Sequence, residues 1–263
     1  MGIWDSYFER VSDVGSCREA AIEDAKMQIS ITAPESPSFH EIKMNGRTIH
    51  ATITKGQTIS EKRISAIPNE RLIHGGIVEF AGGHWLITEL DADNEIYDRG
   101  TMIRCNHILR WIGEDGELKQ KWCIVEDGTK YLIGEHAELK MSVGDSRIAL
   151  TIGKDSDTIA LKRGMRFLID DVDSEDVIAY QITKANRLFN IYEGEGVYRF
   201  ILKEVQLTQH DNIQMRIADY SNWKPPTEND SAHVDSDSSV SDIVSDAIKE
   251  SGSAPEDNEG GWI

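Results

Sequence analysis

Cysteine and histidine side chains come closest together at Cys105-Asn106-His107. Because alternate residues of a β-strand share a face, a thiol and an imidazole at this spacing could touch one ligand. Two ligands do not complete a metal site, and the sequence has no CxxC or HxxxH pair that would supply the others. We therefore expect ordinary packing roles within a half-buried strand here, and no metal site.

Carboxylates gather at two turns, residues 91–95 and 170–176. The first turn alternates oxygen ligands as a calcium loop does, but Ile96 stands where that loop needs glycine and Met102 where it needs glutamate. Solvated acidic turns are the simpler interpretation of both. The sequence has no GxSxG turn and no phosphate-binding loop, and a strand pattern rather than a helix follows Gly194-Glu195-Gly196. We expect no enzymatic activity and no cofactor.

Residues 3–29 are predicted to be helical. Aromatic and apolar side chains recur at helical spacing, and Gly15 with Ser16 interrupts the pattern before a run of strong helix formers. A short amphipathic helix outside a β body is often a docking element, and a helix that packs back on its own sheet is the alternative. The candidate docking residues are Trp4, Tyr7, Phe8 and Val11.

From Ile29 onward the apolar pattern changes to the period of two that is typical of β-strands. Asn45-Gly46 lies between two alternating runs, which predicts a β-hairpin, and Gly82-Gly83 predicts another. We place a first β domain at residues 30–143. Strands and turns at this pitch are typical of a barrel or a sandwich, and Trp85 is expected in its core.

A second β domain is predicted at residues 144–220. A faint repeat links it to the first, because in both domains a glycine precedes two strands of which the second ends in Ile-Thr. Two copies of one small barrel would explain the repeat, but we favour generic hairpin chemistry. The predicted strands are residues 148–152, 158–161, 166–169, 177–184, 197–205 and 214–217.

Residues 221–263 form an acidic tail with ten Asp and Glu residues and two Lys. Their Ser, Asp and Gly content leaves too little apolar area to offset the entropy of ordering, so we expect disorder. An apolar helical stripe and an apolar end could order on a partner, and a purely solubilising tail is the alternative. The residues concerned are Val240, Ile243, Val244, Ala247, Ile248 and Trp262.

The chain has 263 residues, and its 46 acidic and 28 basic residues give a net charge of −18. This charge argues against direct binding to nucleic acid or to an anionic membrane, both of which need a basic surface. Three scattered cysteines do not make a disulfide framework, so we expect reduced thiols. We also expect no signal peptide and no membrane span. The fold class is thus mainly β: two small barrel or sandwich modules, an N-terminal α-helix and an acidic C-terminal tail.

Short runs of residues between positions 1 and 220 carry a family resemblance. They include Trp4-Asp5-Ser6-Tyr7-Phe8, Gly75-Gly76-Ile77-Val78, Trp85-Leu86-Ile87-Thr88, Glu95-Ile96-Tyr97, Arg104-Cys105-Asn106, Glu126-Asp127-Gly128-Thr129-Lys130-Tyr131, Asp145-Ser146-Arg147-Ile148, Arg166-Phe167-Leu168-Ile169-Asp170 and Ile217-Ala218-Asp219-Tyr220. Together they are similar to structural proteins from tailed phages of Gram-positive bacteria. The acidic tail departs from that pattern.

The resemblance implies a virion structural protein, assembled in the bacterial host cytoplasm and placed in the neck as a head-tail connector, stopper or head-completion protein. Such proteins are β-barrels that form a homo-oligomeric ring between the portal or its adaptor and the tail proteins. They carry no catalytic residues. Genomic DNA would pass through the lumen without specific binding, and no membrane is involved.

Two other functions remain open. A capsid- or tail-associated phage protein with a binding role would use two β domains and a flexible tail equally well. A β-sandwich hydrolase or carbohydrate-binding protein would need tryptophan rings on its surface, on which a sugar can stack. The candidate rings are Trp85, Trp111, Trp122 and Trp223.

Overall fold

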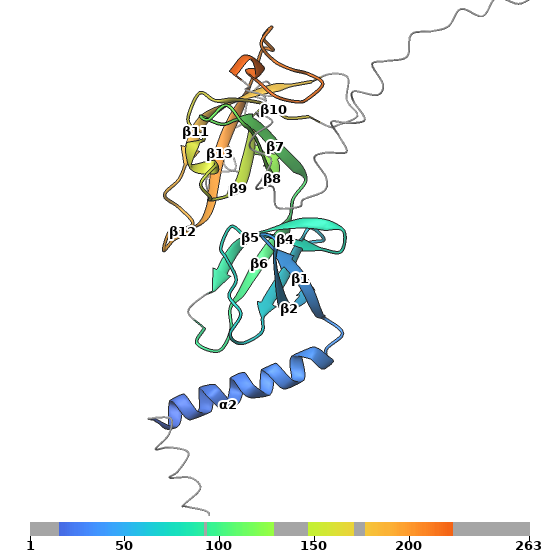
Figure 1. Cartoon of the computed structure of the whole chain (residues 1–263), viewed down its shortest axis with the longest axis vertical. Helices are drawn as coiled ribbons and strands as arrows, with labels where there is room; N and C mark the ends of the chain where they lie inside the picture. Colours follow the sequence, from blue (N-terminus) through green and yellow to red (C-terminus); the bar gives the residue numbers. More distant parts are fainter. Residues whose placement is uncertain (1–15, 92–93, 129–146, 171–176, 223–263) are drawn as a thin grey trace, which may run out of the picture. The chain divides into compact units, whose positions relative to one another are not determined.

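The computed structural model describes residues 16–91, 94–128, 147–170 and 177–222 (Figure 1). The predicted helix is confirmed at Cys17–Thr32 (α2), and the earlier part of the predicted segment lies outside the described residues. Ser16 caps the helix, because its hydroxyl accepts the Glu19 N–H at 3.2 Å. A short 3₁₀ turn at Ala33–Glu35 (η1) follows, with proline in its first turn.

The first sheet is a closed barrel in the order β1-β2-β3-β6-β5-β4, in which β4 pairs back to β1. Apolar side chains alternate along these strands, and the inward set forms the core around Ile64, Ile87 and Met102. The strands are Phe39–Met44 (β1), Arg47–Lys55 (β2), Glu61–Ala66 (β3), Ile77–Phe80 (β4), Gly83–Asp91 (β5) and Arg99–Arg104 (β6).

Two tight turns shape this barrel. The predicted Asn45-Gly46 hairpin is confirmed between β1 and β2, and both residues have positive φ, 48° and 78°. The second hairpin is shifted by one residue from our prediction. Its turn is Ala81-Gly82, again with positive φ at both positions, because Gly83 pairs with Phe80 and belongs to β5.

The second sheet follows the order β10-β11-β13-β9-β8-β7, with β12 paired to β13. Its core contains Phe167, Phe200 and Leu150, all fully buried. The strands are His107–Ile112 (β7), Leu118–Asp127 (β8), Arg147–Gly153 (β9), Arg166–Leu168 (β10), Ala179–Asn186 (β11), Ile191–Tyr192 (β12) and Glu195–Val205 (β13), and two 3₁₀ turns occur at Thr158–Ala160 (η3) and Tyr220–Asn222 (η4).

Two of the six strands predicted for this region are not strands. At residues 158–161 the chain forms η3, because the Thr158 hydroxyl donates to the Gly153 carbonyl at 3.0 Å and satisfies the backbone locally. Residues 214–217 make only one bridge, between Asn212 and Ile217. Arg216 has a positive φ of 56°, which ends any extended run there. The other four strands are confirmed within one or two residues at most of their ends.

The change of sheet lies between Arg104 and His107, whereas our domain boundary stood between residues 143 and 144. Strands β7 and β8 pair with each other and with β9, so they belong to the second sheet. An alternating pattern shows that a strand has one buried face, but it does not show which sheet the strand joins.

The two sheets share one topology. In order, β1 to β6 correspond to β7, β8, β9, β10, β11 and β13, and β12 is an addition. In the first barrel β4 pairs with β1 and closes the sheet. In the second barrel the corresponding strands, β10 and β7, are in contact. The pairing registers align core positions such as Ile42 with Leu109, Met44 with Trp111, Ile64 with Leu150, Val78 with Phe167, Trp85 with Tyr180, Ile87 with Ile182 and Met102 with Leu202.

This correspondence extends to irregular features, so generic hairpin chemistry is not enough to explain the faint repeat. Both strands β5 and β11 have a register shift at the threonine of their Ile-Thr pair. In both barrels the preceding glycine, Gly75 or Gly164, donates its N–H to the carbonyl of that isoleucine, Ile87 or Ile182, at 2.9 Å. The structure therefore contains two copies of one barrel topology, the explanation that we had disfavoured.

Candidate functional site

Both sets of docking residues predicted from the sequence lie outside the described residues. Trp4, Tyr7, Phe8 and Val11 precede the described part of the chain, and Val240, Ile243, Val244 and Trp262 follow it. Their role in docking stays a prediction. The described residues instead offer α2, an apolar loop, two groups of polar contacts and a joint between the barrels.

Helix α2 is a largely uncovered element. It has 16 residues, none of them buried, and Met27 and Ile31 are 66% and 59% exposed. Its half-buried residues, including Ile22, Ala25 and Ile29, recur at helical spacing along one side. One ion pair ties the helix to the first barrel, between Arg18 Nη1 and Glu95 Oε2 at 2.8 Å. The helix thus has surface available for a partner.

A second exposed apolar group lies between β11 and β13. Leu188 and Phe189 are 86% and 70% exposed, and Tyr192 on β12 is also exposed. Positive φ angles at Asn190 and Glu193 hold the segment in its tight turns. The connection from β5 to β6 has no strand that corresponds to β12, so the second barrel alone presents this loop among the described residues.

The residues of the Cys105-Asn106-His107 run have structural roles. The Asn106 side chain donates to the Val125 carbonyl and accepts the Val125 N–H, both at 2.8 Å, which fixes the crossing from β6 to β7. Burial raises the pKa of the Cys105 thiol to about 12, so the reactive thiolate is absent at neutral pH. Burial also lowers the pKa of His107. These groups do not form a nucleophile–base pair.

The two described carboxylates of the acidic turn at residues 91–95 pair with cations of the protein itself. Asp91 Oδ2 accepts from Arg99 Nε at 2.7 Å, and Glu95 pairs with Arg18. Residues 171–176 of the second acidic turn lie outside the described residues. In the part of the chain that the structure describes, no three His, Cys, Asp or Glu side chains are placed to hold a metal ion together.

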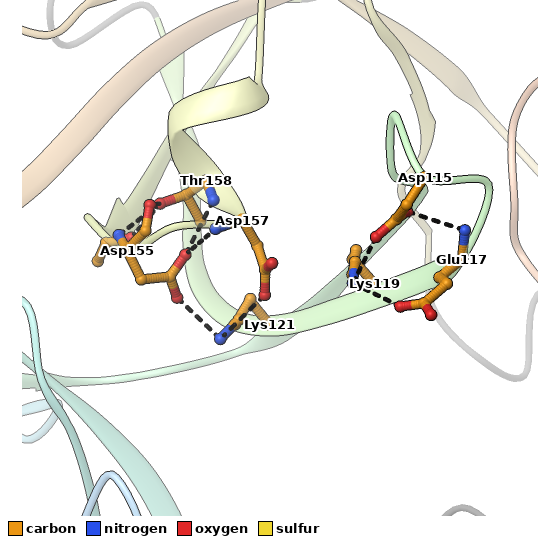
Figure 2. A network of polar contacts seen from close by, with 8 residues as sticks. Asp115, Glu117, Lys119, Lys121, Asp155, Asp157 and Thr158 are labelled. Carbon is orange, nitrogen blue, oxygen red and sulfur yellow. Dashed lines mark hydrogen bonds and ion pairs between the residues drawn. The ribbon is translucent and has the colours of Figure 1, made fainter. Parts of the chain in front are cut away.

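Two lysines on β8 organise the polar contacts drawn in Figure 2. Lys119 Nζ lies 2.8 Å from Glu117 and 2.9 Å from Asp115, which braces the turn between β7 and β8. The hydrogen bonds that the Lys119 ammonium donates to Glu117 and Asp115 raise the pKa of Lys119. The backbone N–H of Glu117 and the Lys119 ammonium lower the pKa of Asp115. Both groups therefore stay charged at neutral pH, which suits bracing rather than proton transfer.

The second lysine of Figure 2 braces the loop after β9. Lys121 Nζ lies 2.8 Å from Asp155 Oδ2, and Asp155 Oδ1 also accepts the Thr158 N–H at 2.8 Å. Partial burial raises the pKa of Asp155, but the hydrogen bonds from Lys121 and Thr158 outweigh it, and the net pKa lies below its usual value. The carboxylate is thus an anchor for the loop and not a general acid.

The two barrels meet at an apolar joint. The His84 ring stacks on Trp122 with centroids 4.1 Å apart and planes 14° apart. Around them Leu86 and Cys105 of the first barrel pack with Ile124 and Val197 of the second. Since an added Cβ at Gly75 would lie 2.0 Å from the Gly196 carbonyl oxygen, only glycine at position 75 permits this approach of the two backbones. Cys105 belongs to this joint, which its spacing from His107 did not indicate.

The candidate sugar-stacking rings are not open surfaces where the structure describes them. Trp85 and Trp111 lie in the two barrel cores, 5% and 2% exposed. Trp85 Nε1 donates to the Phe80 carbonyl at 3.1 Å, as expected for a structural tryptophan. Trp122 is stacked in the joint, and Trp223 lies outside the described residues.

Residues 20–104 match a family model described as the YomX N-terminal domain. The matched segment begins inside α2 and ends where β6 ends, so it comprises most of the helix and the whole first barrel. The family name is phage-associated, and the match supports a phage-related protein. No curated protein and no solved structure matches the chain.

None of the helices that the structure describes is both long enough and apolar enough to cross a bilayer.

Proposed function

We propose that this protein is a ring subunit in the neck of a tailed phage, where it joins the portal or its adaptor to the tail. The observation that carries the proposal is α2, a 16-residue helix without a buried residue. In proteins most of the stability of a helix comes from packing one of its faces, so a partner surface would stabilise this one. Most of the helix lies in the segment that matches the phage-associated family, beside the first barrel.

The arrangement of exposed surfaces supports a ring. A closed ring uses heterologous interfaces, in which two different faces of each subunit meet. Helix α2 adjoins the first barrel and the loop around Phe189 belongs to the second, so the chain offers apolar groups on different modules. In the ring, α2 of one subunit would pack on its neighbour or on the adjoining ring of portal, adaptor or tail protein.

The charge of the chain suits a channel for DNA. With a net charge of −18, the surface gains little from counterion release when DNA passes, so the genome would slide through without specific binding. We propose no enzymatic role. The thiol and the imidazole that lie closest together in the sequence are those of Cys105, which is buried, and His107, which is half-buried, and both are neutral at pH 7.

The proposal is tested in phage particles. Purified virions should contain on the order of a dozen copies per particle, the number expected of one ring. A phage that carries a stop codon early in this gene should yield filled heads and separate tails in the electron microscope. Complete, infectious particles without the protein would contradict a neck function. Hundreds of copies per virion would instead favour the capsid- or tail-associated alternative.

A further inference from the structure

The first barrel uses one outer face to bind the second barrel. Ile77, Leu86, Ile103 and Cys105 point outward from β4, β5 and the end of β6, and they form the apolar part of the joint. His84, also on β5, stacks on Trp122 at the edge of the same face. This outer face of β4, β5 and β6 is named the docking face of the first barrel.

The shared topology defines the corresponding face on the second barrel. Because Ile87 aligns with Ile182 and Met102 with Leu202, the pairing registers place Arg166 where the first barrel has Ile77. In the same way, Ala179 takes the place of His84, Gln181 of Leu86 and Val205 of Cys105. The outer face of β10, β11 and β13 is thus the equivalent of the docking face.

In the second barrel this equivalent face is covered by the chain itself. Ala218 is buried, and it packs in one cluster with Leu168, Ala179 and Val205, which point outward from the three strands. It belongs to residues 206–220, the segment that follows β13 and is named the plug. On the first barrel the docking face is covered by the second barrel. On the second barrel the plug covers the equivalent face.

Charged contacts hold the plug at one residue of the face. Arg166 Nη2 lies 2.7 Å from Asp211 Oδ2, and Nη1 lies 3.1 Å from Asp219 Oδ1. Arg166 also donates to the Gln206 carbonyl at 3.0 Å and to the Thr208 hydroxyl at 3.1 Å. The Asp211 side chain is 1% exposed, so this pair is shielded from solvent. In the first barrel the same position is Ile77, an apolar residue of the joint.

We propose that residues 206–220 plug a second barrel-docking face, and that the partner which fits this face is a barrel of the same topology in a second copy of this chain. A module that buries one face against its neighbour needs a cap where the series ends, or the exposed face associates. The plug supplies this cap and limits the series to two barrels. The inference goes beyond the proposed function and does not depend on it.

The test changes the plug and leaves the face intact, in the full-length protein. Asp211→Asn/Asp219→Asn removes both carboxylate charges that hold Arg166. Trypsin cleavage at Arg216 should become at least about tenfold faster, since hydrogen bonds to charged groups are the strongest contacts of the plug. Sedimentation velocity should then show a concentration-dependent species larger than in the unchanged protein. Asp91→Asn/Glu95→Gln, which makes the same change of charge on the first barrel, is the matched control and should show neither effect.

A second variant should release the plug from the second barrel more completely. Adding Ala218→Asp to the two changes places a charge in the apolar contact of the plug, again without altering the face. Release of the plug without new association beyond the control would overturn the proposal. Two other outcomes would also overturn the proposal. One is that the second barrel no longer unfolds cooperatively, and the other is that the plug stays protected from trypsin in both variants. Either would show that the segment is an integral part of that barrel.

Discussion

Thr88 and Thr183 occupy the same place in the two barrels. Each lies at the register shift of its strand, and each hydroxyl donates to a main-chain carbonyl of the next strand, that of Thr101 at 3.4 Å and that of Ile201 at 3.0 Å. The shift interrupts the regular ladder at this threonine, and the hydroxyl adds a hydrogen bond between the two strands there.

The difference in these two distances predicts a difference in stability. Thr183→Val keeps the shape of the side chain and removes its hydroxyl, so it should lower the free energy of unfolding by about 0.5–1.5 kcal/mol. Thr88→Val should cost less, because its bond is longer. Urea denaturation measures both, with Thr54→Val on the exposed side of β2 as the control. Equal losses at all three positions would show that the register shifts do not depend on these hydroxyls.

Trp85 should behave as a core residue of the first barrel. Its ring is 5% exposed and packs on Phe80, so Trp85→Ala should cost about 3–5 kcal/mol of unfolding free energy. Trp85→Phe keeps much of the packing but loses the hydrogen bond to the Phe80 carbonyl, and it should cost clearly less. Thermal denaturation compares the two. A change well under about 1 kcal/mol for alanine would show that the ring is not part of the core.

A break in α2 should separate assembly from folding. Ala25→Pro places proline in the middle of the helix, where it costs about 3 kcal/mol or more of helix stability. Since α2 buries no residue, the barrels should melt at an unchanged temperature while helical circular dichroism falls. In an infection supplied with this variant, neck assembly should fail. Gln28→Ala on the exposed side is the control. Barrels that unfold with the helix would show that α2 belongs to their core.

The three cysteines should differ in reactivity. Cys17 is exposed, whereas Cys105 and Cys123 are buried. Burial raises the pKa of Cys105 to about 12 and also raises that of Cys123, so both stay protonated and unreactive at pH 8. Intact-mass measurement after iodoacetamide treatment should find one adduct on the native protein and three after denaturation. More than one adduct on the native protein would indicate that the joint around Cys105 opens.

Removal of residues 221–263 tests the predicted role of the acidic tail. The melting temperature of the barrels should not change, because the tail composition cannot bury much apolar area. Neck assembly should weaken, because the apolar stripe from Val240 to Ile248 and the end at Trp262 are expected to pack on a neighbouring subunit. Added salt should weaken the attachment of the unchanged protein, since part of it is electrostatic. Full infectivity of the truncated form would reduce the tail to a solubilising appendage.

The sequence by itself determined the elements whose signals are local. The period-two pattern and the Asn45-Gly46 pair predicted the hairpin of β1 and β2, and the run of strong helix formers after Ser16 predicted the helix that is α2. These predictions held because backbone preference and one-sided burial act over a few residues. Where a side chain satisfied the backbone locally, as Thr158 does in η3, the same pattern misled.

Only the tertiary structure decided which strands share a sheet. The alternation in β7 and β8 is the same whichever barrel they join, so the boundary at Arg104 and His107 was not visible in the sequence. The same holds for the joint of His84 with Trp122 and for the plug that Arg166 holds through Asp211. Their partners are 38 and 45 residues apart in the chain, and long-range contacts of this kind are set by the packing of whole faces rather than by spacing along the chain.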